Sequence, residues 1–409
     1  MRGRSAIAAA LLMIAAGCMG AADEAPTAVA TPDADAGVVV APDGTVLSPA
    51  HFAGATAVDL TTWYNGTFTV QDLSRPVPFG PGPSDLGLVP PPFKRIDITK
   101  DVPTGVPVRI IAQVDAAITQ GDVDLWPEVP DGEWRTGNWD TPRGGHSRVE
   151  VGIAHESSDP VAIVLAYDEA EPAQEFAYTL SVRIVSDPTL LVNGIVTGVT
   201  LPAEPRLSIE LVGEKREREI FDRIDVMAFA PDDTYLGSFP LAESGASEVA
   251  FPAGSPAGEY VFLLTQGGRN ARILVADANG SAPMRAVGQE FVNGDVVVGD
   301  ASGHAKWTTD YDRVPLLVGL NFRSPNAAQN VAVKLDGPKG PLLDDAIEGG
   351  PWMSVRLPDG TSISDGFGWD TGYGAPGLDK GTYTHEVTFT TSGGPDNVEG
   401  QSMAAFYTR

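Results

Sequence analysis

The apolar residues of this chain fall in short runs that are rich in β-branched side chains and end at turn residues. Such runs predict β-strands, because β-branched side chains pack well on a pleated sheet. The clearest runs are residues 108–114, 149–153, 161–167, 178–185, 207–212, 260–265, 331–335 and 382–390. Strands at this spacing are typical of antiparallel sandwiches or barrels. The expected fold class is therefore all-β.

Local patterns also recur along the chain. A strand that runs into a Pro-Asp turn appears with Pro130, Pro231 and Pro358, and a late strand led by tyrosine appears with Tyr178, Tyr260 and Tyr383. Proline fixes φ at the second turn position, so each Pro-Asp pair predicts a hairpin corner. These repeats, with polar breaks at Asp187-Pro188 and Asp300-Ala301, predict three tandem antiparallel β-sandwich modules of Ig-like or jelly-roll type. Their expected ranges are 56–187, 188–300 and 301–409.

The N-terminus has the pattern of an export signal. Arg2 and Arg4 precede an apolar segment of 11 residues, Ala6 to Ala16, which is shorter than the roughly 20 residues that span a bilayer. The segment ends in Ala16-Gly17-Cys18, and here the sequence resembles a bacterial lipoprotein signal with its lipobox. The resemblance implies cleavage after residue 17 and lipid attachment to Cys18. The alternative is an ordinary secretory signal that happens to contain a cysteine.

The segment that follows, residues 18–55, is rich in Ala, Pro, Asp, Gly and Thr and has little periodicity. Such a composition predicts a disordered tether that would hold the folded part away from the membrane. The expected location is therefore the outside of the cell, with the chain lipid-anchored to the cell envelope at the outer membrane or cell surface.

Composition adds three constraints. The 46 glycines and 34 prolines among 409 residues favour many turns and argue against a helical bundle. The formal charge of −27 repels phosphate backbones, so no nucleic-acid partner is expected. Cys18 is the only cysteine, so an internal disulfide cannot form and the modules must be stabilised by core burial.

The sequence offers little catalytic chemistry. The five histidines are not clustered, and no Gly-x-Ser-x-Gly motif is present. His146, Arg148 and Glu150 alternate with Val149, Val151 and Ile153. This alternation predicts a strand with one solvated face and one buried face. Arg148 would repel a cation on that face. No catalytic residue is identified, and the protein is expected not to be an enzyme.

Calcium is the one metal that the acidic residues would suit, since it prefers several carboxylate or carbonyl oxygens. Asp122 and Asp124 would share one strand face, and Asp115 would lie near them across a hairpin. The other interpretation is an acidic face that is simply solvated. No other cofactor is expected.

Two glycine-rich loops contain aromatic residues next to a carboxylate, and the glycines would leave the aromatic faces uncovered. The first holds Trp134, Trp139 and Asp140, and the second holds Trp369, Asp370 and Tyr373. Flat aromatic faces beside hydrogen-bonding groups suit carbohydrate or peptide ligands. The tripeptide Trp-Asp-Thr occurs in both loops, however, and a recurring tryptophan is also typical of a core element. Both interpretations remain open.

The stretch Gly121-Asp122-Val123-Asp124-Leu125, followed by Pro130-Asp131-Gly132, resembles the pre-peptidase C-terminal-like domain and related bacterial Ig-like modules. The resemblance implies a sandwich fold for the first module. Together with the signal, it leads us to expect a lipid-anchored binding, adhesion or envelope-scaffold protein without catalytic activity. The alternative is a carbohydrate-binding or accessory protein of a secreted hydrolase system. The expected partners are the membrane, through lipidated Cys18, and a cell-surface protein or polysaccharide.

Overall fold

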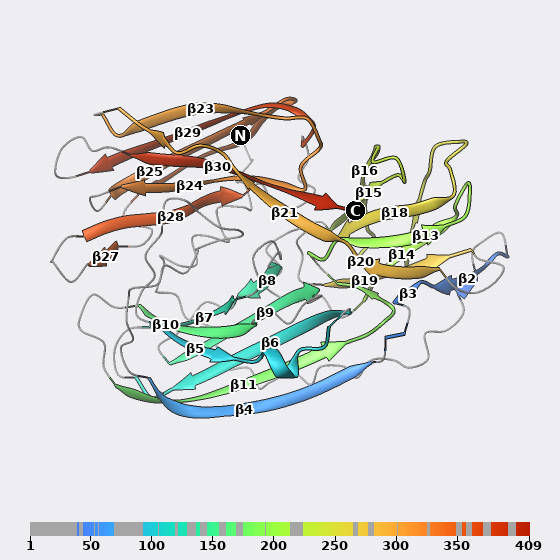
Figure 1. Ribbon diagram of the computed structural model, residues 1–409, viewed down its shortest axis with the longest axis horizontal. Coiled ribbons are helices and arrows are strands. Elements are labelled where there is room, and N and C mark those ends of the chain that lie inside the picture. Colours follow the sequence, from blue (N-terminus) through green and yellow to red (C-terminus); the bar gives the residue numbers. More distant parts are fainter. Residues whose placement is uncertain are drawn as a thin grey trace.

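The computed structural model describes residues 39–40, 44–52, 54–55, 57–68, 93–104, 106–118, 122–128, 136–139, 145–154, 161–168, 175–192, 194–212, 224–264, 269–276, 282–300, 302–324, 328–348, 354–356, 362–370, 378–391 and 398–409. These residues form sheets that are antiparallel in all but one short strand pair and that pack as sandwiches, joined by turns and one short 3-10 helix, η1 (Thr99–Asp101) (Figure 1). The predicted all-β fold class is confirmed.

The first sandwich lies along the lower side of the molecule in Figure 1. Its larger sheet has the strand order β4 (Val58–Phe68), β11 (Phe176–Ser186), β6 (Pro107–Ala116), β9 (His146–Ala154) and β8 (Thr136–Trp139). Its smaller sheet has the order β5 (Phe93–Asp97), β10 (Ala162–Asp168) and β7 (Asp122–Glu128). Alternate side chains such as Ile110, Val149 and Leu180 are fully buried between the two sheets.

The second sandwich combines two distant parts of the sequence. One sheet has the order β1 (Val39–Val40), β2 (Val46–Pro49), β19 (Asn270–Val275), β14 (Leu207–Val212) and β17 (Ala246–Val249), with β12 (Leu190–Leu191) also on β19. The other has the order β16 (Tyr235–Pro240), β15 (Asp225–Phe229), β18 (Gly258–Leu264), β13 (Thr197–Leu201), β20 (Pro283–Ala286) and β3 (His51–Phe52).

Residues 46–52 correct the predicted tether. They were expected to be disordered, yet β2 pairs with β19 and β3 pairs with β20, while Leu47, Ala50 and Phe52 are buried. These strands are short and their partners lie more than 200 residues away in the sequence, so the local pattern could not reveal the pairing. Residues 39–40 and 46–52 therefore belong to the second sandwich and not to a tether.

The third sandwich also begins earlier than predicted. One sheet has the order β21 (Gly288–Asn293), β30 (Glu399–Thr408), β24 (Leu317–Ser324), β28 (Ser362–Asp370) and β27 (Ser354–Arg356), with β22 (Val297–Val298) also on β30. The other has the order β23 (His304–Tyr311), β29 (Gly381–Thr391), β25 (Ala328–Gly337) and β26 (Gly340–Glu348). Because β21 and β22 pair with β30, the module boundary lies near Val287 and not at residue 300.

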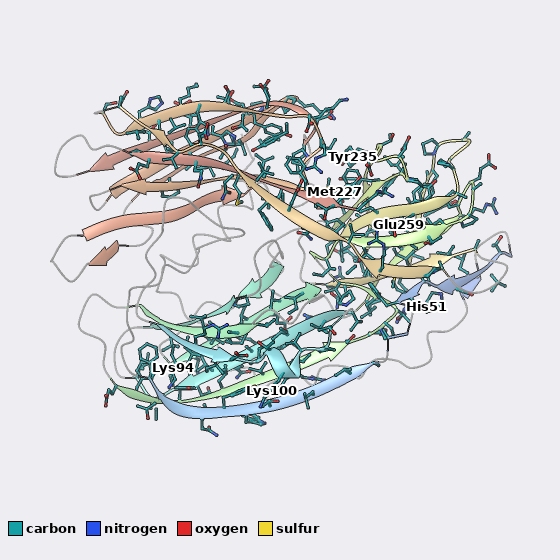
Figure 2. The ribbon with its side chains drawn as sticks, viewed as in Figure 1. His51, Lys94, Lys100, Met227, Tyr235 and Glu259 are labelled. Atoms are coloured by element: carbon teal, nitrogen blue, oxygen red, sulfur yellow. The ribbon has the colours of Figure 1, made fainter. Side chains whose placement is uncertain are left out.

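The second and third sandwiches are packed sheet on sheet. In β15 and β18, Val226 and Phe262 point into the second sandwich, whereas Met227 and Val261 belong to an apolar cluster shared with the third. In β24 and β30, the shared cluster takes in Leu317, Met403 and Ala405. Figure 2 labels Met227 and Tyr235 on the side of the second sandwich that faces the third. These strands are buried on both faces, which makes the pair of sandwiches a four-layer stack.

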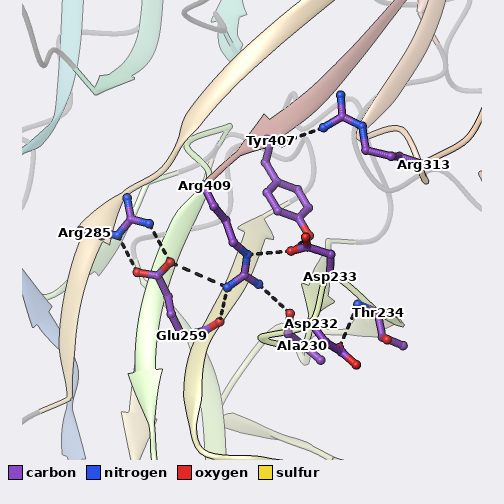
Figure 3. A network of polar contacts seen from close by, with 9 residues as sticks. All are labelled: Ala230, Asp232, Asp233, Thr234, Glu259, Arg285, Arg313, Tyr407 and Arg409. Atoms are coloured by element: carbon purple, nitrogen blue, oxygen red, sulfur yellow. Dashed lines mark hydrogen bonds and ion pairs between the residues drawn. The ribbon is translucent and has the colours of Figure 1, made fainter.

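Polar contacts of Arg409, the last residue of the chain, also connect the third sandwich to the second (Figure 3). The Arg409 guanidinium donates to the carbonyl oxygens of Ala230 and Glu259, over 2.6 and 2.9 Å, and to Oδ1 of Asp233 over 2.7 Å. The Tyr407 hydroxyl donates to the same Asp233 oxygen over 2.9 Å. The C-terminus of the third sandwich is therefore bound to the hairpin corner of the second.

Candidate functional site: the outer face of the first sandwich

The edge strand β4 displays an exposed tryptophan. Its residues alternate, so that Tyr64 and Phe68 pack toward the sandwich core while Trp63 lies on the opposite side. The Trp63 side chain is 63% exposed, the largest exposed fraction of any large hydrophobic residue in the described part of the chain. The indole keeps most of its flat apolar surface in solvent in the middle of a regular strand, so that surface is free to contact a ligand, and Trp63 is therefore a candidate binding residue.

Three further strands extend the surface around Trp63. We call it the outer face and define it by Asp59, Thr61, Trp63 and Asn65 of β4, Thr179, Ser181, Arg183 and Val185 of β11, Arg109, Ile111, Gln113 and Asp115 of β6, and His146, Arg148 and Glu150 of β9. The register places Trp63 opposite Ser181, and Ser181 opposite Gln113. From standard strand geometry the outer face measures about 14 Å across its strands and about 20 Å along β4.

The groups nearest Trp63 are short and polar. Ser181 is too small to cover the indole, and Thr61 and Asn65 flank Trp63 as exposed residues of the same strand face. The Thr179 hydroxyl donates to the side-chain oxygen of Asn65 over 2.9 Å, which fixes the orientation of that amide. The surroundings of Trp63 therefore offer hydroxyl and amide groups rather than further apolar area.

The charges on the outer face are paired with one another. Arg183 holds Asp59 with two hydrogen bonds, from Nε to Oδ1 over 2.7 Å and from Nη2 to Oδ2 over 2.5 Å. The hydrogen bond from Arg183 lowers the pKa of Asp59 below its ordinary value and the pKa of Arg183 is raised in turn, so both groups are charged at neutral pH.

Glu150 is the one carboxylate of this face that is buried, with 3% exposure. One of its oxygens accepts a hydrogen bond from Arg109 and the other accepts one from Arg148. A buried carboxylate needs such partners, because desolvation would otherwise favour its protonated form. The predicted strand is confirmed here, with Val149, Val151 and Ile153 buried on the other side, but Glu150 is clamped rather than solvated.

Asp115 contacts the Nδ1 atom of His146 at the end of the same face. With this pair, the described side chains of the outer face carry three arginines and three carboxylates. With the imidazole counted as neutral, their formal charges cancel, on a chain whose formal charge is −27. A neutral surface with one exposed indole is chemically suited to an uncharged ligand.

The three candidate calcium ligands do not lie as predicted. Asp115 is at the end of β6, which pairs with β11 and β9, whereas Asp122 and Asp124 are in β7, which pairs with β10 in the other sheet. The expected hairpin between them does not form, because the chain crosses from one sheet to the other. Among the residues that the structure describes, no group of three His, Cys, Asp or Glu residues is placed to hold a metal ion.

The two Trp-Asp-Thr motifs occupy different positions in their sheets. Trp139 is the last residue of β8, which lies at the edge of the larger sheet of the first sandwich, and it pairs with the fully buried Val149. Trp369 and Asp370 are in β28, which is flanked by β24 and β27. Trp369 stands at a register shift, between Gly368 opposite Leu320 and Asp370 opposite Gly319. Trp134, Asp140, Tyr373 and the predicted anchor Cys18 lie outside the described residues.

Sequence reasoning missed Trp63, although a local signal was present. In the segment 58–68 the odd positions are Asp59, Thr61, Trp63, Asn65 and Thr67, so the tryptophan is the one apolar residue on an otherwise polar strand face. A period of two with an aromatic residue on the polar side marks an exposed aromatic group. The charge pairing around it involves strands far apart in the sequence and has no comparable local signal.

Comparisons with known proteins do not assign the chain to a family. No protein-family model matches the chain, and no curated protein matches it. Among solved structures, a chain from "Structure of infectious bursal disease virus Gx strain" aligns over 88% of this chain and 74% of that chain, with 10% identity and a TM-score of 0.21. So low a TM-score carries no conclusion. In the described part of the chain no helix is long and apolar enough to cross a membrane.

Proposed function

We propose that this protein is an exported, lipid-anchored binding protein of the cell surface, without catalytic activity, and that the outer face of the first sandwich is its binding surface. The observation that carries the proposal is Trp63, an exposed indole on a regular, charge-compensated sheet face. Export and anchoring are proposed from the N-terminal signal pattern, whose apolar segment ends in Ala16-Gly17-Cys18. The absence of catalytic activity is proposed because arginines hold the Asp59 and Glu150 carboxylates of the outer face in ion pairs.

The stack of sandwiches supports a role in display. The apolar core is continuous from the first sandwich into the second, and a second apolar cluster joins the second sandwich to the third. Shared cores resist bending more than flexible linkers do. A stiff body at the end of the lipid-anchored tether would carry the three sandwiches, and with them the outer face, as one unit.

The anchor is tested by detergent phase partitioning of whole-cell extracts. The wild-type protein is expected in the detergent phase and Cys18→Ser in the aqueous phase. Equal partitioning of the two would contradict the anchor.

The binding role is tested with the mature chain, residues 18–409, coupled to beads. Cys18 is the only cysteine, so maleimide coupling attaches the protein at the anchor position. Beads are expected to adhere to isolated cell envelopes, and Trp63→Ala is expected to abolish adherence. The matched control is Val298→Ala, which truncates another exposed hydrophobic residue, 60% exposed and on the third sandwich. Adherence that does not depend on Trp63 would contradict the proposed binding surface.

A further inference from the structure

The ligand class follows from the chemistry of the outer face. We infer that the outer face binds a neutral polysaccharide, with the indole of Trp63 stacking on the apolar face of a sugar ring. This inference rests on the proposed function and names the ligand of that same surface. Three features of the face lead to it: the shape of the exposed aromatic group, the polar groups around it and the balance of charge.

The first feature is the exposed indole itself. A pyranose ring presents C–H groups on its faces and hydroxyl groups around its rim. An exposed indole supplies a flat apolar surface of matching size, and aromatic side chains supply contact area at little cost in side-chain entropy. Trp63 is 63% exposed and lies opposite the small Ser181, so a ring has room to approach it.

The second feature is the ring of hydrogen-bonding groups around Trp63. Thr61 and Asn65 lie on either side along β4, and Ser181 and then Gln113 lie across the sheet. The Asn65 amide is already oriented by Thr179. Donors and acceptors that are held in place before binding lose less entropy when a sugar hydroxyl is bound. The exposed hydroxyls and amides match the rim of a sugar as the indole matches its face.

The third feature is neutrality. Asp59 is held by Arg183 and Glu150 by Arg109 and Arg148, and with Asp115 the three carboxylates of the face balance its three arginines in formal charge. An acidic polysaccharide would gain no net attraction here and would be repelled by the charge of −27 on the whole chain. An uncharged polymer meets no such barrier.

The dimensions of the face favour an extended polymer over a single sugar. A sheet face of about 14 by 20 Å accommodates several rings in a row. A protein partner fits less well, because the buried centre of a protein interface is usually apolar and Trp63 is the one exposed large hydrophobic residue on the face. The outer face contains two further apolar residues, Ile111 and Val185, of which Ile111 is buried and Val185 is half-buried.

The inference is tested by affinity electrophoresis and pull-down with the full chain in detergent. Dextran, hydroxyethylcellulose and galactomannan are cast into native gels, cellulose and chitin serve as insoluble ligands, and polygalacturonate is the acidic comparison. We expect binding to at least one neutral polymer and none to polygalacturonate. Trp63→Ala should raise the dissociation constant by about tenfold or more, as for the central residue of a binding surface.

Two further variants separate binding from folding. Trp63→Phe keeps a smaller aromatic face and should retain part of the affinity. Ser181→Glu leaves the indole in place but adds bulk and charge opposite it, and should weaken binding as Trp63→Ala does. Val298→Ala should bind as the wild type does. Thermal unfolding should be nearly unchanged in all four variants, because each replaced side chain is at least partly exposed.

Three outcomes would overturn the inference: no neutral polymer binds, the acidic polymer binds as well as the neutral ones, or Trp63→Ala binds as the wild type does. These outcomes are separable from failure of the proposed function. If envelopes bind through Trp63 but every polysaccharide fails, the binding role survives and the ligand is a protein. If polysaccharide binds but Cys18→Ser leaves partitioning unchanged, the lipid anchor fails while the ligand class stands.

Discussion

Tyr260 and Tyr383 make the same hydrogen bond in two different sandwiches. Each hydroxyl donates over 2.6 Å to the carbonyl oxygen of the residue four positions earlier, Pro256 for Tyr260 and Asp379 for Tyr383. Immunoglobulin-type sandwiches contain a comparable bond, known as the tyrosine corner. Two residues before each tyrosine is a glycine with positive φ, and a proline ring lies where its Cβ would be.

This relationship gives the first prediction, which concerns the stability of both sandwiches. Tyr260→Phe and Tyr383→Phe should each lower the free energy of unfolding by about 0.5–1.5 kcal/mol for the bond that the hydroxyl donates. Tyr383→Phe should cost more within this range, because it also removes the bond that this hydroxyl accepts from the Asp379 N–H. Gly381→Ala should cost about 1–3 kcal/mol, since φ is +135° there and the new Cβ would lie 3.0 Å from Cγ of Pro338. Urea unfolding measures all three. A cost in one tyrosine variant and none in the other would show that the two corners are not equivalent.

The corner also revises which turns correspond. The repeat of Pro-Asp turns predicted that Pro231 and Pro358 are counterparts. In the structure Gly258 lies against Pro231, and Gly381 lies against Pro338 in the turn between β25 and β26. The repeat of the late strand led by tyrosine, at Tyr260 and Tyr383, was therefore the better guide, because it reflects a contact that both sandwiches make. The Pro-Asp pattern reflects only local turn geometry.

The strands could be predicted from the sequence, whereas the packing of the second sandwich on the third could not. Each of the eight predicted runs lies wholly or almost wholly within a strand, because β-branched runs bounded by turns depend on local propensity. The continuous apolar runs Val226–Phe229 and Tyr260–Leu264 carried a further signal, burial on both strand faces. Which partner covers the second face depends on tertiary packing and cannot be read from such a run.

The second prediction concerns the C-terminal arginine. Arg409→Ala removes three hydrogen bonds between the third sandwich and the second, two to Ala230 and Asp233 at the hairpin corner and one to Glu259 in β18. We expect the free energy of unfolding to fall by about 1–3 kcal/mol. The control is Lys339→Ala, which removes an exposed ion pair with Asp379 within the third sandwich and should have no measurable effect. Unfolding midpoints of Arg409→Ala that match the wild type would show that the apolar cluster alone holds the joint.

The third prediction concerns the charge pairs of the outer face. Glu150→Gln leaves Arg109 and Arg148 facing each other without a carboxylate between them. Stability should fall by about 1–3 kcal/mol, and the loss should shrink at high salt, which screens the repulsion. Asp115→Asn is the matched control, because its pair with His146 is largely exposed and should contribute under about 0.5 kcal/mol. Equal losses in the two variants, or a loss that salt does not change, would contradict this account.

The last prediction concerns His385, which is fully buried in β29 and stacks on Trp307 with ring centroids 5.3 Å apart. Neither ring nitrogen has a hydrogen-bond partner among the residues that the structure describes. Burial lowers the pKa of His385 to about 4, from an ordinary value of 6.5. Between these two values the unfolded chain binds a proton that the folded chain does not, so folding stability must fall as pH falls.

The loss from His385 should begin near pH 6.5 and approach about 3 kcal/mol near pH 4. His385→Phe keeps an aromatic ring against Trp307 but cannot be protonated, so the difference in stability between wild type and variant should change with pH over this range. Urea unfolding from about pH 7 down to about pH 4.5 measures the slope of stability against pH, which is proportional to the difference in bound protons between the unfolded and folded states. A wild-type-minus-variant difference that is constant with pH would mean that His385 is already charged, or has water access, in the folded protein.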